Sequence, residues 1–139
     1  MLTIQVKLLR PDAKMPTRAH ATDAGLDLYA AESCELEPHK TQAVRTGVAL
    51  AIPEGWYGQI RDRSSLAFRG VTVGGGVLDA SYRGEVRVLL TAHDTRFLVL
   101  EGTRVGQITI HPVPEVELIH VSELAETERG EGGFGSTGV

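Results

Sequence analysis

Cysteine is nearly absent from this 139-residue chain, which carries only Cys34. A single cysteine cannot form a disulfide within the chain and suits a reducing compartment, so we expect a cytoplasmic protein. No serine stands in a GxSxG elbow, so a hydrolase triad has no support in the sequence. The histidines show no HxxxH ligand spacing, which argues against a structural zinc site. They lie at positions 20, 39, 93, 111 and 120.

Long apolar runs and an excess of positive charge are missing too. The segment 1–11, MLTIQVKLLRP, alternates and ends at Pro11, unlike a signal peptide or a membrane span. The formal net charge of −4 argues against binding to long nucleic acid, which needs a basic face. We therefore expect neither a membrane nor long nucleic acid as a partner. A few local arginines could still bind one small polyanion.

No stretch sustains a 3.6-residue periodicity, whereas many short stretches alternate as strands do. In one of them Val86, Val88 and Leu90 fall on the same face. This pattern predicts one all-β domain, an antiparallel β-barrel or jelly-roll-like fold with at most one short helix. We expect that helix at 64–68, capped by Ser64 or Ser65. The expected strands are 2–9, 43–53, 85–93, 96–102, 104–113 and 115–121.

The C-terminal end differs in composition from the rest of the chain. We place the barrel at 1–121 and a linker with a glycine-rich end at 122–139, within the same domain. Residues 129–139, RGEGGFGSTGV, contain five glycines and one aromatic ring, Phe134. They hold too few apolar groups to offset the entropy of ordering. They are either a disordered end or a lid that orders when a ligand fills the site beneath it.

Two polar clusters interrupt the first half of the chain. In 22–30, TDAGLDLYA, Gly25 permits an unusual backbone angle, and Asp27 is either a turn cap or an acid near a metal. In 61–67, RDRSSLA, two arginines flank an acid and two serines open the expected helix. This second cluster is either a capped helix on a solvated face or a phosphate cradle of N–H groups, hydroxyls and a guanidinium.

Two further clusters lie in the second half. In 73–85, VGGGVLDASYRGE, the glycines permit close approach to the backbone, whose N–H and C=O groups could read a flat polar ring. Asp79 at the foot of this hairpin could orient a water as general base, acting mainly through its position. The alternative is an ordinary hairpin in which Tyr82 covers the turn. Gln107, in 102–110, is either a sheet-surface amide or a hydrogen-bonding group of a site.

These clusters stand in the order of the motifs of a known enzyme family. The chain resembles the homotrimeric deoxyuridine triphosphate nucleotidohydrolases, the dUTPases, across nearly its whole length. The third and fifth motifs are highly specific, whereas any one of the others alone is weak evidence. The matching stretches are AGLDLYA at 24–30, RSSLA at 63–67, GVLDASYRGE at 76–85, RVGQI at 104–108 and RGEGGFGSTG at 129–138.

The resemblance implies a role for each matching residue. Asp79 would orient the water that attacks the α-phosphorus, and Tyr82 would pack on the deoxyribose and exclude a 2′-hydroxyl. Backbone groups of 73–82, Gly76 included, would read the uracil edge. Phe134 would stack on the uracil ring, and Asp27 would support a magnesium site through water. The remaining substrate-binding residues that the resemblance implies, mostly phosphate contacts, are Arg63, Ser64, Ser65, Gln107, Arg129, Gly135, Ser136 and Thr137.

The resemblance also implies a reaction and an assembly. The reaction is the Mg²⁺-dependent hydrolysis of dUTP to dUMP and pyrophosphate, which keeps uracil out of DNA and supplies dUMP for dTTP synthesis. Family members are β-barrel-like trimers in which the tail of one chain closes a site that the other two build. Two residues depart from the family pattern: Thr103 replaces an acid before the arginine, and Glu131 replaces a tail serine or threonine. We expect Thr103 to act at a turn and Glu131 to face solvent.

Two other functions stay open. A deoxycytidine triphosphate deaminase shares the fold and an RSSLA-like motif, but it would need a glutamate to activate water at the base and usually lacks this tail. A non-catalytic nucleotide-binding protein on the same fold would be expected to lack the water-orienting acid or the lid. Asp79, Tyr82 and the complete tail motif favour a dUTPase over both.

Overall fold

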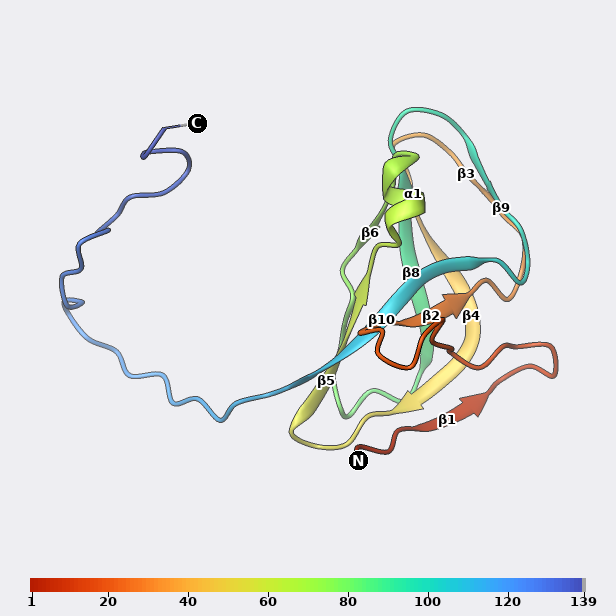
Figure 1. Cartoon of the computed structure of the whole chain (residues 1–139), viewed down its shortest axis with the longest axis horizontal. Coiled ribbons are helices and arrows are strands. Elements are labelled where there is room, and N and C mark those ends of the chain that lie inside the picture. The colour runs from red at the N-terminus through yellow and green to blue at the C-terminus, as the bar shows by residue number, and fades with distance from the viewer. Residues whose placement is uncertain (139) are drawn as a thin grey trace.

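Short strands dominate the computed structural model, which describes residues 1–138 (Figure 1). One helix, α1 (Ser64–Phe68), follows the fifth strand. The strands are β1 (Gln5–Leu8), β2 (Leu26–Tyr29), β3 (Cys34–Leu36), β4 (Thr41–Ala51), β5 (Trp56–Arg61), β6 (Val71–Gly74), β7 (Val77–Leu78), β8 (Glu85–Ala92), β9 (Phe97–Val99) and β10 (Arg104–Pro112). The predicted all-β fold with one short helix is confirmed. Val139, the last residue of the predicted lid, lies outside the described residues.

Most strands pair into two four-stranded antiparallel sheets. The first has the order β1-β4-β8-β6 and the second β2-β10-β5-β7, while β3 and β9 form a two-stranded sheet. Alternation in the sequence explains the burial, because Val86, Val88 and Leu90 of β8 point inward and are fully buried. They join Leu28 of β2 and Ile108 of β10 in one hydrophobic core to which both sheets contribute.

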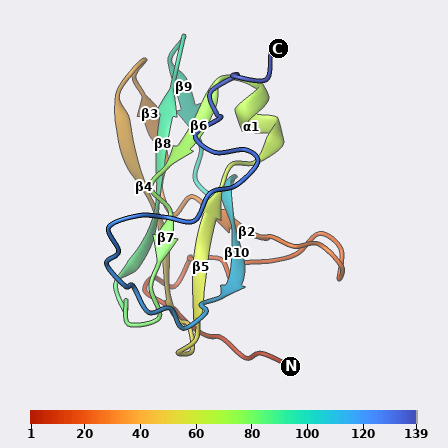
Figure 2. The ribbon, with the colours of Figure 1, turned by 90° about the vertical axis from the view of Figure 1, so that its left-hand side faces the viewer.

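The connection between β6 and β7 passes from one sheet to the other (Figure 2). β6 is the edge strand on β8, whereas β7 pairs with β5. Gly75 and Gly76 make the crossing with φ angles of 64° and 100°, which glycine adopts without steric cost. A Cβ on Gly76 would lie 2.7 Å from the carbonyl oxygen of Ile60, so a larger residue does not fit. This crossing belongs to the predicted base-reading hairpin.

Two local predictions are wrong. Residues 115–121, expected as a strand, form no regular structure and are exposed throughout. Their alternation is that of a strand, but no strand within residues 1–138 pairs with them. Helix α1 has Arg63 as its N-cap residue and no side-chain cap, because Ser64 and Ser65 already lie inside the helix. The expected strands also leave out β2, β3, β5, β6 and β7, which are short or contain charged or glycine residues.

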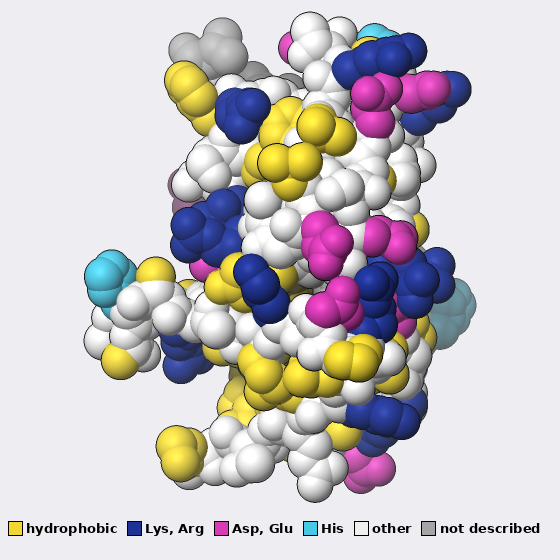
Figure 3. All heavy atoms as spheres, turned by 90° about the vertical axis from the view of Figure 1, so that its right-hand side faces the viewer, with side chains coloured by type: hydrophobic (Ala, Val, Ile, Leu, Met, Phe, Trp, Pro, Cys, Tyr) yellow, Lys and Arg dark blue, Asp and Glu magenta, His cyan; other side chains and the backbone are white. Residues whose placement is uncertain are grey.

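The face on the right-hand side of Figure 1 carries charges of both signs. Figure 3 shows basic and acidic side chains interspersed there, with hydrophobic side chains between them. This face therefore has no broad basic surface of the kind that binds long nucleic acid. Among residues 1–138, no helix has the length and apolar character needed to cross a bilayer.

Candidate functional site

The predicted hairpin borders a small cavity of about 240 Å³. Gly76, Asp79 and Tyr82 all line it, so the structure brings together the backbone, the acid and the ring that were predicted to act on one nucleotide. Its other lining residues are Ile60, Val77, Leu78, Glu85, Arg87 and Leu89. A partly apolar wall with a few convergent polar groups is typical of a site for a small organic ligand.

Tyr82 folds back over the turn that follows Asp79. Its amide N–H donates to the carbonyl oxygen of Asp79 at 3.1 Å, and its phenol donates to the carbonyl oxygen of Glu85 at 2.9 Å. A Cβ on Gly84 would lie 2.4 Å from the phenol oxygen, so the ring can take this position only beside glycine. Tyr82 therefore covers the turn and forms a wall of the cavity at the same time.

Glu85 fastens the outgoing strand of the hairpin to β4. Its carboxylate accepts hydrogen bonds from Nε of Arg45 at 3.0 Å and from the backbone N–H of Gly47 at 2.9 Å. The hydrogen bond and charge of Glu85 raise the pKa of the Arg45 guanidinium. These contacts fall where the pairing of β4 with β8 shifts register, between Arg45 and Ala49. The register shift in β4 thus fixes the position of Glu85, whose carbonyl oxygen accepts the hydrogen bond from Tyr82.

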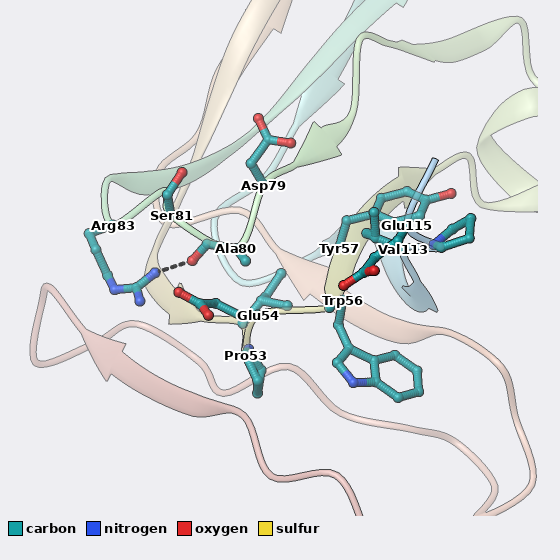
Figure 4. Close-up of a pocket in the computed structure, with 13 residues that line it drawn as sticks. Pro53, Glu54, Trp56, Tyr57, Asp79, Ala80, Ser81, Arg83, Val113 and Glu115 are labelled. Atoms are coloured by element: carbon teal, nitrogen blue, oxygen red, sulfur yellow. Dashed lines mark hydrogen bonds between the residues drawn. The ribbon is translucent and has the colours of Figure 1, made fainter. Parts of the chain in front are cut away.

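Asp79 also borders a larger cavity of about 1020 Å³ (Figure 4). In this view its carboxylate points away from Glu54, Trp56 and Tyr57, which line other parts of the cavity. The Asp79 side chain is exposed, so a water or a phosphate group can reach it. Asp79 therefore stands at the junction of the two cavities.

A second group of predicted residues meets at the start of α1. Asp27 of β2 accepts hydrogen bonds from Nε of Arg63 at 3.1 Å and from an Nη of Arg104 at 3.3 Å. Nη1 of Arg63 lies 3.4 Å from the hydroxyl of Ser65. Arg63, Ser65 and Arg104 line a cavity of about 550 Å³. Asp27 is not a turn cap, one of its two predicted roles, because it lies inside a strand and orients two guanidinium groups.

Gln107 is held rigidly beside this group. Its Nε2 donates to the carbonyl oxygen of Asp62 at 2.8 Å, and a Cβ on Gly25 would lie 2.0 Å from its Oε1. Gly25 is therefore needed for close approach, and the expected unusual backbone angle is wrong, since its φ is not positive. Gln107 is half-buried and hydrogen-bonded, so it is more than an amide on the sheet surface.

The tail stands apart from both groups. Figure 1 shows the chain leaving the sheets after β10, and residues 112–131 are exposed. Nε of Arg129 donates to the carbonyl oxygen of Gly132 at 2.8 Å, within the tail itself. The ring of Phe134 is fully exposed, and Gly135, Ser136 and Thr137 are exposed as well. The predicted site residues thus form three separate groups in one chain: hairpin, α1 group and tail.

The described residues offer few ligands for a metal ion. Within residues 1–138, no group of three or more His, Cys, Asp or Glu side chains could hold one. The carboxylate of Asp27 already binds two guanidinium groups. The side chains present therefore fit a magnesium ion that takes most of its ligands from a bound polyphosphate and water, as Mg²⁺ often does.

Sequence reasoning missed three residues that shape these groups: Asp62, Gly84 and Arg104. Each lies in a stretch that was already singled out and could have been found there. Asp62 is the acid between the two arginines of RDRSSLA, Gly84 belongs to YRGE and Arg104 to RVGQI. Thr103 lies in a turn as expected, whereas the prediction that Glu131 faces solvent concerns a closed lid and stays a prediction. The hydroxyl of Thr103 donates to the carbonyl oxygen of Leu100 at 2.6 Å, in a turn, and Glu131 is exposed.

Comparison with known proteins assigns these groups to one family. The sequence model of the dUTPase family matches residues 11–138. The deoxyuridine 5′-triphosphate nucleotidohydrolase of Clostridium tetani is 44% identical over 140 residues, which covers 98% of this chain and 97% of that protein.

Solved structures agree with the sequence match. The dUTPase of Staphylococcus bacteriophage 80alpha with dUPNHPP has a TM-score of 0.91 and 34% identity, covering 99% of each chain. A mutant dUTPase from phage phi11 of S. aureus, which coordinates a structural Mg(II) ion, has a TM-score of 0.81 and 30% identity, covering 87% of this chain and 97% of that one. By its sequence, its fold and the order of its motifs, the chain belongs to the dUTPase family.

Proposed function

We propose that this chain hydrolyses dUTP to dUMP and pyrophosphate, which would keep uracil out of DNA and supply dUMP for dTTP synthesis. The observation that carries the proposal is the hairpin of this dUTPase-family chain. It combines an exposed carboxylate at Asp79, a ring wall at Tyr82 and the half-buried backbone of Gly76 around one cavity. A cytoplasmic location stays a prediction.

Asp79 is the proposed general base. Its carboxylate would orient a water in line with the α-phosphorus and accept the proton that the water loses. The water oxygen forms a new bond to the α-phosphorus as the bond from that phosphorus to the bridging oxygen of the β-phosphate breaks. Pyrophosphate then leaves. The exposed position of Asp79 allows both the water and the phosphate to approach it.

Base and sugar selectivity are assigned to the hairpin. Backbone N–H and C=O groups around Gly76 would pair with the uracil edge, in a pocket too tight for the methyl group of thymine. The ring of Tyr82, fixed by its bond to the carbonyl oxygen of Glu85, would pack on the deoxyribose and leave no space for a 2′-hydroxyl. A fixed wall discriminates better than a mobile one because displacing it costs free energy.

The α1 group is the proposed phosphate-binding part. Arg63, Ser64, Ser65 and Gln107 present a guanidinium, two hydroxyls and an amide, which suit the oxygens of a triphosphate. Asp27 holds Arg63 in place through its 3.1 Å bond to Nε, so the guanidinium is oriented before substrate arrives.

Magnesium is the proposed cofactor, a proposal supported by the structural Mg(II) ion of the phi11 enzyme. When bound to the triphosphate, the ion would neutralise the charge of the phosphates and of the departing pyrophosphate. Asp27 would contact it through water, because Arg63 and Arg104 occupy the carboxylate.

A homotrimer with sites between subunits is the proposed assembly. The hairpin cavity and the α1 cavity have no lining residue in common, and the tail residues up to 138 make only local hydrogen bonds in one chain. Val116, Leu118 and Ile119 are 77%, 94% and 73% exposed on a segment that alternates like a strand. Such apolar exposure is typical of a surface that another chain covers.

The tail is the proposed lid of a neighbouring copy's site. Arg129, Gly135, Ser136 and Thr137 would contact the phosphates, and Phe134 would stack on the uracil. Closure of this kind excludes bulk water and strengthens the charge interactions around the reacting phosphate.

Nucleotide selectivity of the unmodified protein tests the proposal. Pyrophosphate and ammonia would be measured with dUTP, dTTP, UTP and dCTP in the presence of Mg²⁺. We expect rapid pyrophosphate release from dUTP alone. Ammonia from dCTP would identify a deaminase instead, and binding of dUTP without turnover would identify a non-catalytic nucleotide-binding protein.

A further inference from the structure

Asp62 links two parts of the molecule that the proposed function treats separately. It lies between β5 and α1, directly before Arg63. Its carboxylate accepts a hydrogen bond from the backbone N–H of Val73 on β6. Its own carbonyl oxygen accepts the bond from Nε2 of Gln107 at 2.8 Å. The side chain of Asp62 therefore binds the strand that leads into the hairpin, and its main chain binds Gln107 of the proposed phosphate-binding group.

The N–H of Val73 stands at a critical point of the fold. β6 is an edge strand, paired on one side only with β8, so Asp62 supplies a partner on its other side. Val73 directly precedes the glycines that carry the chain across to β7. On the far side of that crossing, the carbonyl oxygen of Gly76 accepts a bond from the N–H of Ile60 at 2.7 Å. The flexible crossing is thus fixed at Val73 and again at Gly76.

The negative charge of Asp62 would repel a bound phosphate, because Asp62 directly precedes Arg63, a proposed phosphate-binding residue. Arg61 and Arg63 flank it in the sequence. The bond to Val73 also directs the carboxylate to the hairpin backbone. A charged acceptor makes a stronger hydrogen bond to a backbone N–H than a neutral one does, which gives the acid a purpose at this position.

We propose that Asp62 is a positioning residue for nucleoside recognition. Its carboxylate holds the start of the glycine crossing, and so fixes the backbone of Gly76 and the approach of the chain to Asp79. This inference rests on the proposed function, which assigns the hairpin to the nucleoside. Asp62 itself touches neither the base nor the phosphates in this account.

The two bonds of Asp62 can be separated by substitution. Asp62→Ala removes the carboxylate but keeps the carbonyl oxygen that binds Gln107. Asp62→Asn keeps an oxygen acceptor for Val73 and removes only the charge. A matched control is Ser33→Ala, which removes an exposed 2.9 Å bond from the N–H of Glu101 to the Ser33 hydroxyl, on a segment to which no site role is assigned.

The experiment measures binding of dUMP and of inorganic triphosphate to each variant by calorimetry, together with KM and kcat for dUTP and the melting temperature. For Asp62→Ala we expect the Kd of dUMP and the KM of dUTP to rise about tenfold, the loss of one charge-assisted hydrogen bond. Affinity for inorganic triphosphate stays within about twofold of wild type. Asp62→Asn, which keeps a weaker, neutral acceptor, should raise the Kd of dUMP less than Asp62→Ala does, and Ser33→Ala stays within about twofold for both ligands.

Several results would overturn the inference. Equal loss of dUMP binding in Asp62→Ala and Asp62→Asn would assign the effect to charge. A lower melting temperature with unchanged dUMP affinity in Asp62→Ala would make the residue merely structural. If Asp62→Ala does not fold, Asp62→Glu carries the test, because the displaced carboxylate should weaken dUMP and spare triphosphate. Absence of dUTP turnover by the wild type would count against the proposed function, whereas the dUMP comparison tests Asp62 by itself.

Discussion

At the scale of single residues, the proposed phosphate-binding group depends on a contact between Gly25 and Gln107. The hydrogen bond from Nε2 of Gln107 to the carbonyl oxygen of Asp62 fixes one end of the amide, and Gly25 leaves room for its Oε1. Any side chain at position 25 would meet that oxygen. The amide is therefore held in place before substrate binds, which is what a phosphate contact needs.

We predict that Gly25→Ala weakens dUTP binding through Gln107 alone. The new Cβ would lie 2.0 Å from Oε1, so the amide must leave its position. We expect KM for dUTP to rise about tenfold, or 1.4 kcal/mol. A double-mutant cycle with Gln107→Ala checks the route, since Gly25→Ala should add little in that background. Full additivity of the two substitutions would show that Gly25 acts elsewhere.

Residue roles could be predicted from the sequence only where a motif carried them. Asp79 and Tyr82 stand in one continuous stretch, and the structure places both on one cavity. The Asp27–Arg63–Arg104 group unites residues from three elements, and nothing in their spacing revealed it. Such contacts depend on strand register, which a sequence pattern does not specify across distant strands.

At the scale of elements, residues 115–121 have the sequence pattern of a strand but do not form one. Residues 115–121 alternate apolar and polar side chains as β8 does, yet only β8 has neighbours on both sides. A strand needs a partner for its backbone groups, and residues 1–138 of one chain supply none here. β8 was therefore predictable from alternation, whereas the state of 115–121 was not.

Deleting the chain from Arg129 onward should separate catalysis from folding. Most of the described tail residues are exposed and the tail makes local hydrogen bonds, so the melting temperature should stay nearly unchanged. Hydrolysis of dUTP should fall severely, because the proposed water-excluding lid is lost. Calorimetry and pyrophosphate release measure the two quantities. A large drop in melting temperature would instead indicate that the tail packs into the fold of the assembled protein.

At the scale of the whole molecule, one chain holds all the proposed site parts but does not bring them together. The hairpin cavity, the α1 cavity and the tail are separate in the chain. Composition and alternation predicted the all-β fold, since burial of one strand face depends on local sequence. The assembly could not be predicted in this way, because it depends on surfaces that meet only between copies.

Complementation between two inactive variants tests whether sites are shared. Asp79→Asn lacks the base, and the variant truncated before Arg129 lacks the lid. If each site takes these parts from different copies, unfolding and refolding an equal mixture should restore about a quarter of wild-type activity, since each part is intact in half the copies. No recovery from a properly reassembled mixture would indicate that one copy supplies both parts.

Pyrophosphate release from dUTP by wild type and by Asp79→Asn tests the central claim most directly. The substitution keeps the size of the side chain but removes the carboxylate that is proposed to accept the proton of the attacking water. We predict that dUTP binding stays close to wild type while turnover falls at least about a hundredfold. Near-normal turnover by a folded Asp79→Asn variant would contradict the proposed mechanism and remove Asp79 from its centre.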